Sequence, residues 1–395
     1  MVKYEKYIIN NVNVVTPIAI LEQGAVVVSN GKIRKILHQS ENGNDYNFPV
    51  LNGNNSYLLP GLIDIHTDAL EKEIVPRPGA DFPIDIAFYE LERKMCGCGI
   101  TTAFHSMHLG YESAENSSNS KYDRKELFEE VHKLSQSQNL INNLIHLRFE
   151  LTGLYHYDLV LEMLKSGRIS LLSVMDHTPG QGQFQPEVYL KKLMVDGKSE
   201  EEAQLQIKKA MLRERIQHHE LENLIQTALY NKIPVASHDD DTPEKVRKLA
   251  EMGITICEFP INLETANEAT NLGMDVIGGS ANILRGGSLS GNLSVMDGIK
   301  ERNIDCICSD YYPPSMLHSV FKIYKEGIMS LPESVKLATL NPAKAVKLDT
   351  EIGSIEEGKT ADLILVELLN DRPTVAHTIV KGHLSAQHQY NLQAN

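Results

Sequence analysis

The sequence lacks several features that would point to particular classes of protein. Its 395 residues include no tryptophan, only five cysteines and no apolar run long enough to span a membrane. The N-terminal segment MVKYEKYIINNVNVV has no apolar core of a signal peptide. Basic residues are outnumbered by acidic ones, 38 against 52, which gives a net charge of −14. We therefore expect a cytoplasmic protein whose main partner is neither nucleic acid nor a membrane, although a local pocket could still bind a small anion.

The five cysteines are odd in number and lie in apolar segments: Cys96, Cys98, Cys257, Cys306 and Cys308. They form two C-x-C pairs, whose spacing is shorter than the C-x-x-C spacing usual at zinc sites. Alternate positions of a strand share one face, so we expect these residues to pack in the core of a reduced, cytoplasmic protein.

The two ends of the chain have the same β-rich character. Residues 1–60 contain short segments of alternating apolar and polar residues, with a hairpin signal at Asn30-Gly31. Residues 348–395 repeat this character. We therefore predict one small β-sandwich domain formed by residues 1–60 together with 348–395, and a larger domain formed by residues 61–347.

Between these ends, apolar segments alternate with amphipathic ones. The predicted strands are 58–66, 100–107, 144–151, 170–177, 234–238, 255–259, 275–279 and 304–310, and the predicted helices include 84–95, 124–137, 157–165, 243–252, 263–272 and 316–326. Apolar strands that alternate with helices are typical of a parallel sheet covered on both faces. Eight of them predict an α/β fold with a (β/α)8 TIM-like barrel, and a doubly wound sheet is the alternative.

Two segments interrupt this alternation. Residues 111–123 are a polar stretch after the second strand, either a plain surface loop or a lid over an active site. Residues 200–232 have apolar residues at helical spacing and predict a long amphipathic helical insertion. Packing of this insertion against its own barrel is favoured over a contact in a homodimer, and the sequence leaves both open.

Five of the eight predicted strands end on a histidine or an acidic residue. These residues are His66 and Asp68, Glu150, Asp176 and His177, His238 and Asp239, and Asp310. Because the carboxyl ends of parallel strands meet at one face of a barrel, the side chains are expected to converge. Three histidines with several carboxylates match Zn²⁺ or a similar divalent ion. The strand ends therefore predict a metal centre.

Each of these residues also has a structural interpretation. A histidine at a strand end is often a core or rim residue, and an aspartate there often caps the next helix. Asp310 and residues 239–241 could be such caps, and Asp176 could orient its neighbour. A metal centre is favoured because the structural interpretation would have to hold independently at five strand ends.

Two motifs resemble the amidohydrolase superfamily, PGLIDIHTD at the first strand and the stretch 340–367 near the C-terminus. The resemblance spans nearly the whole chain. It implies a (β/α)8 barrel, a β-sandwich built from both termini, a one- or two-metal site and a catalytic aspartate after the last strand. The sequence departs from the family in having Asp68 where a second histidine is usual. It also has no lysine at a strand end, and Glu150 is the natural substitute for that bridging ligand.

Further motifs resemble those of one particular family within this superfamily. HTDALEKEIVPRPG, HLRFELTG, SVMDHTPGQGQF, ASHDDDT, ILRGGSLSGN and CSDYYPPSML are similar to the PhnM family of the carbon–phosphorus lyase pathway of phosphonate catabolism. This resemblance implies hydrolysis of α-D-ribose 1-methylphosphonate 5-triphosphate to the 5-phosphate and diphosphate. It also implies two divalent ions, with Zn²⁺ expected and manganese or iron as alternatives. The ligands implied are His66, Asp68, Glu150, His177, His238 and Asp310, with Asp310 also accepting a proton in catalysis.

A triphosphorylated sugar needs positive charge around it, which an acidic protein must supply locally. The candidate substrate-binding residues are Lys72, Arg77, Arg148, Arg285, Gly286 and Gly287. The two glycines lie in a segment that could direct backbone N–H groups at phosphate oxygens. His105 and His108 could contact substrate or be structural, and Glu71 has no assigned role. The alternative function is that of a conventional amidohydrolase with the same metal site: a deaminase, a cyclic-amide hydrolase or an N-acyl hydrolase.

Overall fold

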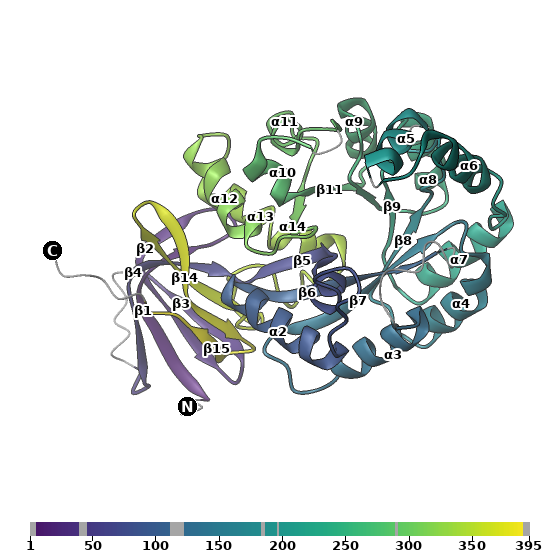
Figure 1. The fold of residues 1–395 in the computed structure, drawn as a ribbon. Helices are drawn as coiled ribbons and strands as arrows, with labels where there is room; N and C mark the ends of the chain where they lie inside the picture. Colours follow the sequence, from purple (N-terminus) through teal and green to yellow (C-terminus); the bar gives the residue numbers. More distant parts are fainter. Residues whose placement is uncertain are drawn as a thin grey trace. The chain divides into compact units, whose positions relative to one another are not determined.

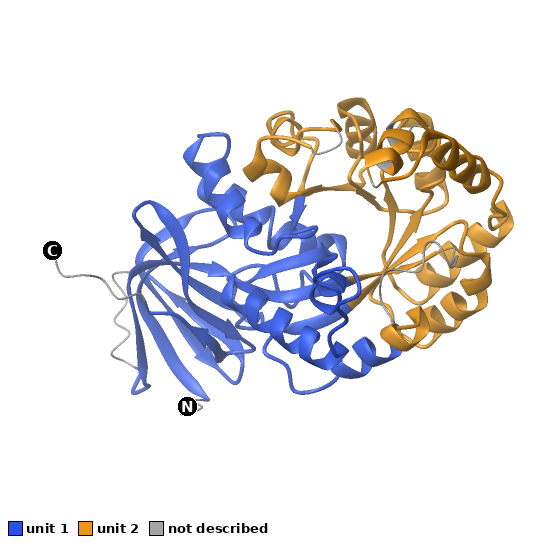
Figure 2. Cartoon of the chain, in the orientation of Figure 1, with its two compact units in different colours: residues 1–105, 129–144, 306–395 blue, residues 106–128, 145–305 orange. Residues whose placement is uncertain are grey.

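The computed structural model describes residues 5–38, 46–110, 122–182, 186–195, 197–288 and 291–389. The chain forms two compact units, which Figure 2 distinguishes by colour. The first unit comprises residues 1–105, 129–144 and 306–395, and the second comprises residues 106–128 and 145–305. The predicted domain limits, 1–60 with 348–395 and 61–347, stay a prediction. No helix among the described residues is both long and apolar enough to cross a membrane.

One sheet is parallel and has eight strands, in the order β12-β11-β10-β9-β8-β7-β6-β5. These strands are β5 (Leu62–Thr67), β6 (Ile100–Leu109), β7 (Asn142–Glu150), β8 (Leu171–Met175), β9 (Val235–His238), β10 (Ile256–Glu258), β11 (Asp275–Gly279) and β12 (Cys306–Cys308). A parallel bridge between Thr67 and Asp310 joins the segments that follow β5 and β12. The sheet therefore approaches closure, and the predicted (β/α)8 barrel is confirmed.

Helices alternate with these strands, as Figure 1 shows by label. They are α1 (Ala69–Ile74), α2 (Ile84–Gly97), α3 (Arg124–Ser135), α4 (Tyr157–Lys165), α5 (Pro186–Val195), α6 (Glu200–Met211), α7 (His218–Tyr230), α8 (Pro243–Glu251), α9 (Leu263–Asn271), α10 (Ser280–Arg285), α11 (Val295–Lys300), α12 (Ser315–Lys325), α13 (Leu331–Lys336) and α14 (Leu340–Ala345). A short 3₁₀ helix, Leu154–His156, precedes α4. Within the second unit, α7 packs against β9 and α9 against β11.

The strands are almost wholly buried, which explains their continuous apolar character. Every residue of β5, β8 and β9 is buried, as expected for strands of a sheet covered on both faces. Four of the five cysteines are buried as predicted, Cys96, Cys257, Cys306 and Cys308, and all five are free thiols.

Two predicted elements are divided in the structure. The predicted strand 58–66 is interrupted at Gly61, between β4 (Val50–Pro60) and β5. A Cβ at Gly61 would lie 2.1 Å from Thr101 Oγ1, so only glycine fits at this junction. The predicted long helix 200–232 is instead α6 followed by α7. A capping box of Gln217 and Glu220 starts α7, and the Ile216 N–H donates to the carbonyl of Leu151, which holds the connecting segment outside either helix.

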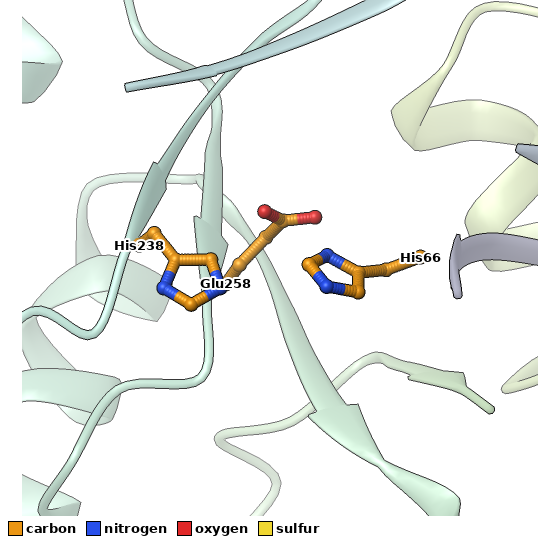
Figure 3. Close-up of side chains that lie close together, drawn as sticks. All are labelled: His66, His238 and Glu258. Carbon is orange, nitrogen blue, oxygen red and sulfur yellow. The ribbon is translucent and has the colours of Figure 1, made fainter. Parts of the chain in front are cut away.

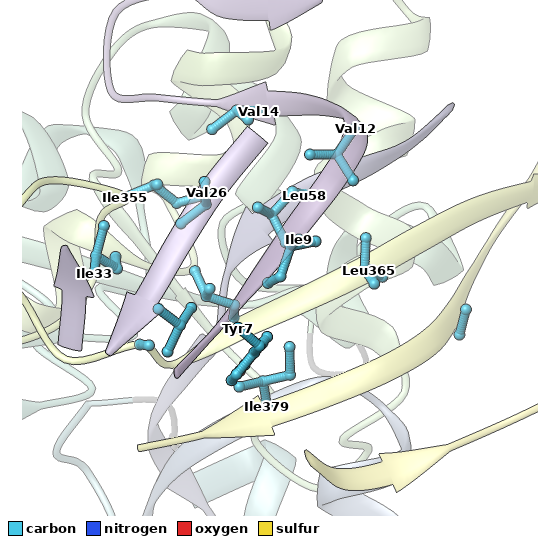
Figure 4. Packing of buried hydrophobic residues seen from close by; sticks show 14 residues of the cluster. Tyr7, Ile9, Val12, Val14, Val26, Ile33, Leu58, Ile355, Leu365 and Ile379 are labelled. Atoms are coloured by element: carbon cyan, nitrogen blue, oxygen red, sulfur yellow. The ribbon is translucent and has the colours of Figure 1, made fainter. Parts of the chain in front are cut away.

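The second sheet is built from both ends of the chain, as predicted. Its seven strands have the order β15-β14-β13-β4-β1-β2-β3. The strands not yet given are β1 (Lys6–Val15), β2 (Ile20–Ser29), β3 (Lys32–Leu37), β13 (Leu363–Leu369), β14 (Arg372–Val380) and β15 (His383–Gln387). The β1–β4 pair is parallel, and the antiparallel pairs are β1–β2, β2–β3, β4–β13, β13–β14 and β14–β15. A core that includes Ile9, Val26, Leu58 and Ile379 packs on this sheet (Figure 4).

Candidate metal centre

The first group of candidate ligands, here called the β5 cluster, consists of His66, Asp68 and Asp310. One ligand atom of each lies within 4.8 Å of the others. His66 Nε2 is 3.7 Å from Asp68 Oδ1; the His66 side chain is buried, whereas 32% of the Asp68 side chain is exposed. The structure thus brings Asp310 beside His66 and Asp68, which are more than 200 residues away in the sequence, and all three are candidates that the strand ends predicted.

Backbone pairing sets the geometry of the β5 cluster. The N–H of Asp310 donates to the carbonyl of His66 at 3.0 Å, and the N–H of Asp68 donates to the carbonyl of Asp310 at 2.6 Å. Asp310 has a φ of 59°, a left-handed conformation that aspartate tolerates better than most residues. The capping interpretation of Asp310 does not hold, because the N-cap of α12 is Pro314. Asp68 precedes α1 but makes no side-chain capping hydrogen bond.

The second group, here called the β9 cluster, consists of His177, His238 and Asp239. Their ligand atoms also lie within 4.8 Å of one another. Asp239 Oδ2 is 3.4 Å from His177 Nε2 and 3.4 Å from His238 Nδ1. The two imidazole rings meet edge to face, with 5.5 Å between centroids. The capping interpretation of Asp239 does not hold either, because the N-cap of α8 is Thr242.

Glu150, the last residue of β7, contacts this cluster through His177. Its Oε1 accepts the backbone N–H of His177 at 2.6 Å, and its Oε2 lies 2.9 Å from His177 Nδ1. Oε2 is nevertheless buried without a hydrogen bond, so the two atoms are close but not aligned as donor and acceptor. A carboxylate oxygen and an imidazole nitrogen placed in this way fit two ligands of one divalent ion. The donor chemistry of these residues therefore suits the metal that the sequence predicts.

Burial and neighbouring charges shift the pKa values of the β9 cluster in opposite directions. Burial lowers the pKa of His177, but Asp239 and Glu150 outweigh burial and raise that pKa to about 9. The pKa of His238 is lowered by burial despite its contact with Asp239. Burial would raise the pKa of Asp239, but His238 and His177 hold it far below its ordinary range. Asp239 is therefore a carboxylate that favours positively charged or metal-bound neighbours.

Sequence reasoning missed Glu258, the last residue of β10. The register of β9 and β10 pairs it with His238, and Figure 3 shows both side chains on these neighbouring strands. Glu258 is fully buried, and its Oε2 accepts a hydrogen bond from Ser173 at 2.6 Å. An acidic residue at the end of the predicted strand 255–259 was the signal that could have identified it.

A series of buried side-chain hydrogen bonds continues from Glu258. Ser173 Oγ lies 2.5 Å from His146 Nε2, and His146 Nδ1 lies 3.3 Å from Ser106 Oγ. His146, Ser173 and Glu258 are all inaccessible to solvent. These hydrogen bonds satisfy a carboxylate that would otherwise be costly to bury, so they fix its position.

The predicted substrate-binding residues lie in different settings. Arg148 Nη2 is 3.4 Å from His238 Nε2. Lys72 Nζ lies over the ring of Tyr311, 4.4 Å from its centroid. Arg77 and Arg285 are exposed, and Gly286 and Gly287 have φ values of 83° and 153° after α10. Among the described residues, geometry links Arg148 to a candidate ligand, while substrate binding by all six stays a prediction.

The other residues considered from sequence have identifiable contacts. His105 is fully buried, with its Nε2 2.9 Å from Asn143 Oδ1, as expected of a structural residue. His108 Nε2 lies 4.0 Å from Glu150 Oε2. Asp176 Oδ2 is 2.9 Å from Arg215 Nη1, an ion pair that the sequence did not predict. Glu71 lies in the first turn of α1. The predicted loop or lid, 111–123, lies outside the described residues except for Tyr122 and Asp123.

A cavity of about 780 Å³ lies in the second unit, beside the segments that follow β6 and β7. It is lined by Gly110, Asp123, residues 152–156, Lys209 and residues 212–214. This volume suits a small-molecule ligand. The sequence predicted neither Lys209 nor Arg213 near a binding site, because both belong to a segment interpreted as a helical insertion.

Comparisons with known proteins agree with this architecture. A model of the amidohydrolase family matches residues 295–384. The chain is 32% identical over 385 residues to alpha-D-ribose 1-methylphosphonate 5-triphosphate diphosphatase of Escherichia coli strain K12, covering 95% of this chain and 99% of that protein. It is 30% identical over 147 residues to an adenine deaminase of Clostridium botulinum strain 657, covering 34% of this chain and 23% of the deaminase. N-acetylglucosamine-6-phosphate deacetylase from Pasteurella multocida has a similar fold, with a TM-score of 0.63, 15% identity and coverage of 96% and 99% of the two chains.

Proposed function

Because the chain belongs to the amidohydrolase superfamily, we propose that it is a metal-dependent diphosphatase of phosphonate catabolism. Membership of the superfamily makes it a hydrolase. The proposed substrate is alpha-D-ribose 1-methylphosphonate 5-triphosphate, and the products are the corresponding 5-phosphate and diphosphate. The observation that carries this proposal is the similarity to the E. coli diphosphatase along almost the full length of both proteins.

We propose that two divalent ions bind, with Zn²⁺ expected and manganese or iron as alternatives. The residues that would hold them are His66, Asp68 and Asp310 of the β5 cluster, together with Glu150, His177 and His238. The buried Glu150 Oε2, which lacks a hydrogen bond but lies 2.9 Å from His177 Nδ1, supports a metal at that position. Such ions supply a hydroxide nucleophile at neutral pH and neutralise charge on phosphoryl oxygens.

The reaction breaks the phosphoanhydride bond between the first and second phosphate groups of the substrate, and the elements of water are divided between the two products. In this proposal Asp310 accepts the proton of the attacking water. Its carboxylate belongs to the β5 cluster, and its backbone is fixed by hydrogen bonds to His66 and Asp68. A carboxylate held in this way is placed to act as a general base.

Positive side chains would orient the anionic substrate. Arg148 is the candidate that the geometry supports, because its guanidinium group lies 3.4 Å from His238 Nε2. Lys72, stacked on Tyr311 beside Asp310, is the corresponding candidate near the β5 cluster. Arg77, Arg285, Gly286 and Gly287 complete the proposed substrate-binding set. A triphosphate needs several such donors, whereas a neutral amide does not.

The alternative is that the protein is a conventional amidohydrolase. The partial similarity to an adenine deaminase is the observation that supports this alternative. The test offers the Zn²⁺- or Mn²⁺-loaded protein four substrates in parallel: the ribose 5-triphosphate, adenine, a cyclic amide and an N-acyl sugar. We expect diphosphate release from the triphosphate and no turnover of the other three. Turnover of an amide or of adenine without diphosphate release would contradict the proposal.

A further inference from the structure

The position of Asp239 between two histidines has no role in the function proposed above. Its Oδ2 lies 3.4 Å from His177 Nε2 and 3.4 Å from His238 Nδ1. The opposite nitrogens of the two rings face other groups: His177 Nδ1 lies 2.9 Å from Glu150 Oε2, and His238 Nε2 lies 3.4 Å from Arg148 Nη2. Asp239 therefore lies beside one nitrogen of each imidazole. The other nitrogen of His177 faces the candidate ligand Glu150, and that of His238 faces the candidate substrate contact Arg148.

We propose that Asp239 is the shared positioning carboxylate of the metal site. With ions bound, its Oδ2, which lies 3.4 Å from each of these two nitrogens, would accept hydrogen bonds from His177 Nε2–H and His238 Nδ1–H and would so direct His177 Nδ1 and His238 Nε2 to the ions. A histidine that binds a metal through one nitrogen usually donates its other N–H to a carboxylate or carbonyl, which fixes the tautomer and the ring orientation. Here a single carboxylate serves two histidines. Asp239 is then a positioning residue and not a ligand.

The backbone around Asp239 is constrained by its neighbours, which fixes the carboxylate beside the two histidines. Its φ of 51° lies in the left-handed region, and its N–H donates to the carbonyl of Glu258 at 2.9 Å. A Cβ at Gly182 would lie 2.7 Å from the Asp239 carbonyl oxygen, so the facing loop approaches too closely for any other residue. A non-glycine residue adopts such a conformation only where its surroundings impose it. The side chain is also buried, which requires the carboxylate to have partners.

Glu150 and Asp239 differ in the number of imidazoles that their carboxylates face. Glu150 Oε2 lies 2.9 Å from one ring nitrogen, His177 Nδ1, whereas Asp239 Oδ2 lies 3.4 Å from ring nitrogens of two histidines. Glu150 Oε2 and His238 Nδ1 are both buried without a hydrogen bond, so ion binding, and not burial, distinguishes a ligand from a positioning residue. This inference rests on the metal dependence in the proposed function. Its test measures ion binding, so that an absence of diphosphatase activity would leave it standing.

The first experiment compares Co²⁺ binding by the wild-type protein, Asp239→Asn and Glu150→Gln, with Asp241→Asn as the matched control. Asn is chosen at position 239 because it tolerates a positive φ. Asp241 is a neighbouring acid whose Oδ2 accepts the Gly182 N–H at 3.2 Å. We expect Asp239→Asn to bind as many equivalents of Co²⁺ as the wild type, roughly 10- to 100-fold more weakly, with an altered visible spectrum.

Glu150→Gln is expected to lose one equivalent, and Asp241→Asn to match the wild type. Loss of an equivalent in Asp239→Asn would identify Asp239 as a ligand and overturn the inference. An Asp239→Asn protein with the affinity and spectrum of Asp241→Asn would overturn it as well, because Asp239 would then have no influence on the ions.

A second measurement uses the wild-type protein and does not depend on the folding of a variant. The histidines are labelled with ¹⁵N and the protein is loaded with ¹¹³Cd²⁺. We expect scalar coupling of cadmium to His177 Nδ1 and His238 Nε2, with protons on His177 Nε2 and His238 Nδ1. Coupling to the nitrogens that face Asp239 would contradict the inference.

Discussion

The pKa values of two buried aspartates in the first unit and of Asp239 in the second unit are shifted in opposite directions. In the first unit, burial raises the pKa values of Asp64 and Asp362 to about 6. In the second unit, burial acts on Asp239 in the same direction, but His238 and His177 reverse the effect and lower its pKa far below the ordinary range. Asp64 and Asp362 therefore bind a proton more tightly than an ordinary aspartate does, whereas Asp239 is kept ionised by its two histidine neighbours.

The two candidate clusters also differ in the contacts that hold their residues in place. The β5 cluster is arranged by backbone hydrogen bonds between the segments that follow β5 and β12. The β9 cluster is arranged by side chains: Glu150 and Asp239 hold His177, while Ser173 holds the neighbouring Glu258. Side-chain substitutions outside the ligand set should therefore disturb the β9 cluster and its surroundings more than the β5 cluster.

The largest expected effect belongs to Asp310→Asn. Because its position is fixed by the backbone and asparagine tolerates the φ of 59°, this change should leave the fold intact, and the asparagine Oδ1 should replace the carboxylate oxygen as a ligand and keep the metal bound. Removal of the proton acceptor should lower kcat about 10²- to 10⁴-fold. Diphosphate release and metal content are measured on the same sample. A rate near that of the wild type would exclude a role for Asp310 as proton acceptor.

A smaller effect is expected from Asp362→Asn in the first unit. The pKa of Asp362 is raised from 3.8 to about 6, chiefly by burial, so the folded protein binds this proton more tightly than the unfolded chain does. Its stabilising contribution is present below about pH 4 and is lost as the pH rises to about 6, by about 3 kcal/mol. The free energy of unfolding in urea is measured at pH 4 and pH 7.

In the wild type, the contribution of Asp362 to the free energy of unfolding should decrease over this pH range, and Asp362→Asn should abolish that part of the decrease. Equal pH dependence of the variant and the wild type would show that Asp362 has an ordinary pKa in the folded protein.

The smallest effect is expected from Ser173→Ala in the second unit. This change removes the hydrogen bond to Glu258 Oε2 and leaves a fully buried carboxylate short of a partner. It should lower the free energy of unfolding by about 1–3 kcal/mol. The control is Ser166→Ala at an exposed position, where water can replace the hydrogen bonds of the hydroxyl to Met163 and Arg168 and a change within about 0.5 kcal/mol is expected. An equal decrease in the free energy of unfolding for the two variants would argue against a special role for the buried hydrogen bonds of Ser173.

The sequence was sufficient to predict the barrel because each buried strand is a continuous apolar run between helices. It also identified strand ends that carry candidate ligands, since a histidine or an acid at the end of an apolar run is visible without coordinates; their role as ligands stays a prediction. The break at Gly61 was not predicted, because it depends on the close approach of Thr101. The boundary between α6 and α7 was missed because helical periodicity continues across it.

Sequence reasoning overlooked Glu258 and gave Asp239 no role of its own, for different reasons. Glu258 ends a predicted strand and could have been included by the rule applied to the other strands. Asp239 was considered, but its sequence neighbours, an acidic run before Thr242-Pro243, are equally typical of a helix cap. Its position between two imidazoles depends on a left-handed backbone conformation, which the sequence does not reveal.

The central claim is that hydrolysis of the triphosphate requires ions at both clusters. The most direct test strips the protein of metal and then measures diphosphate release from the ribose 5-triphosphate as Zn²⁺ is added in fractions of an equivalent. We predict no diphosphate release from the metal-free protein, little activity during addition of the first equivalent and a steep increase during the second. Full activity with one equivalent, or diphosphate release from the metal-free protein, would contradict the claim.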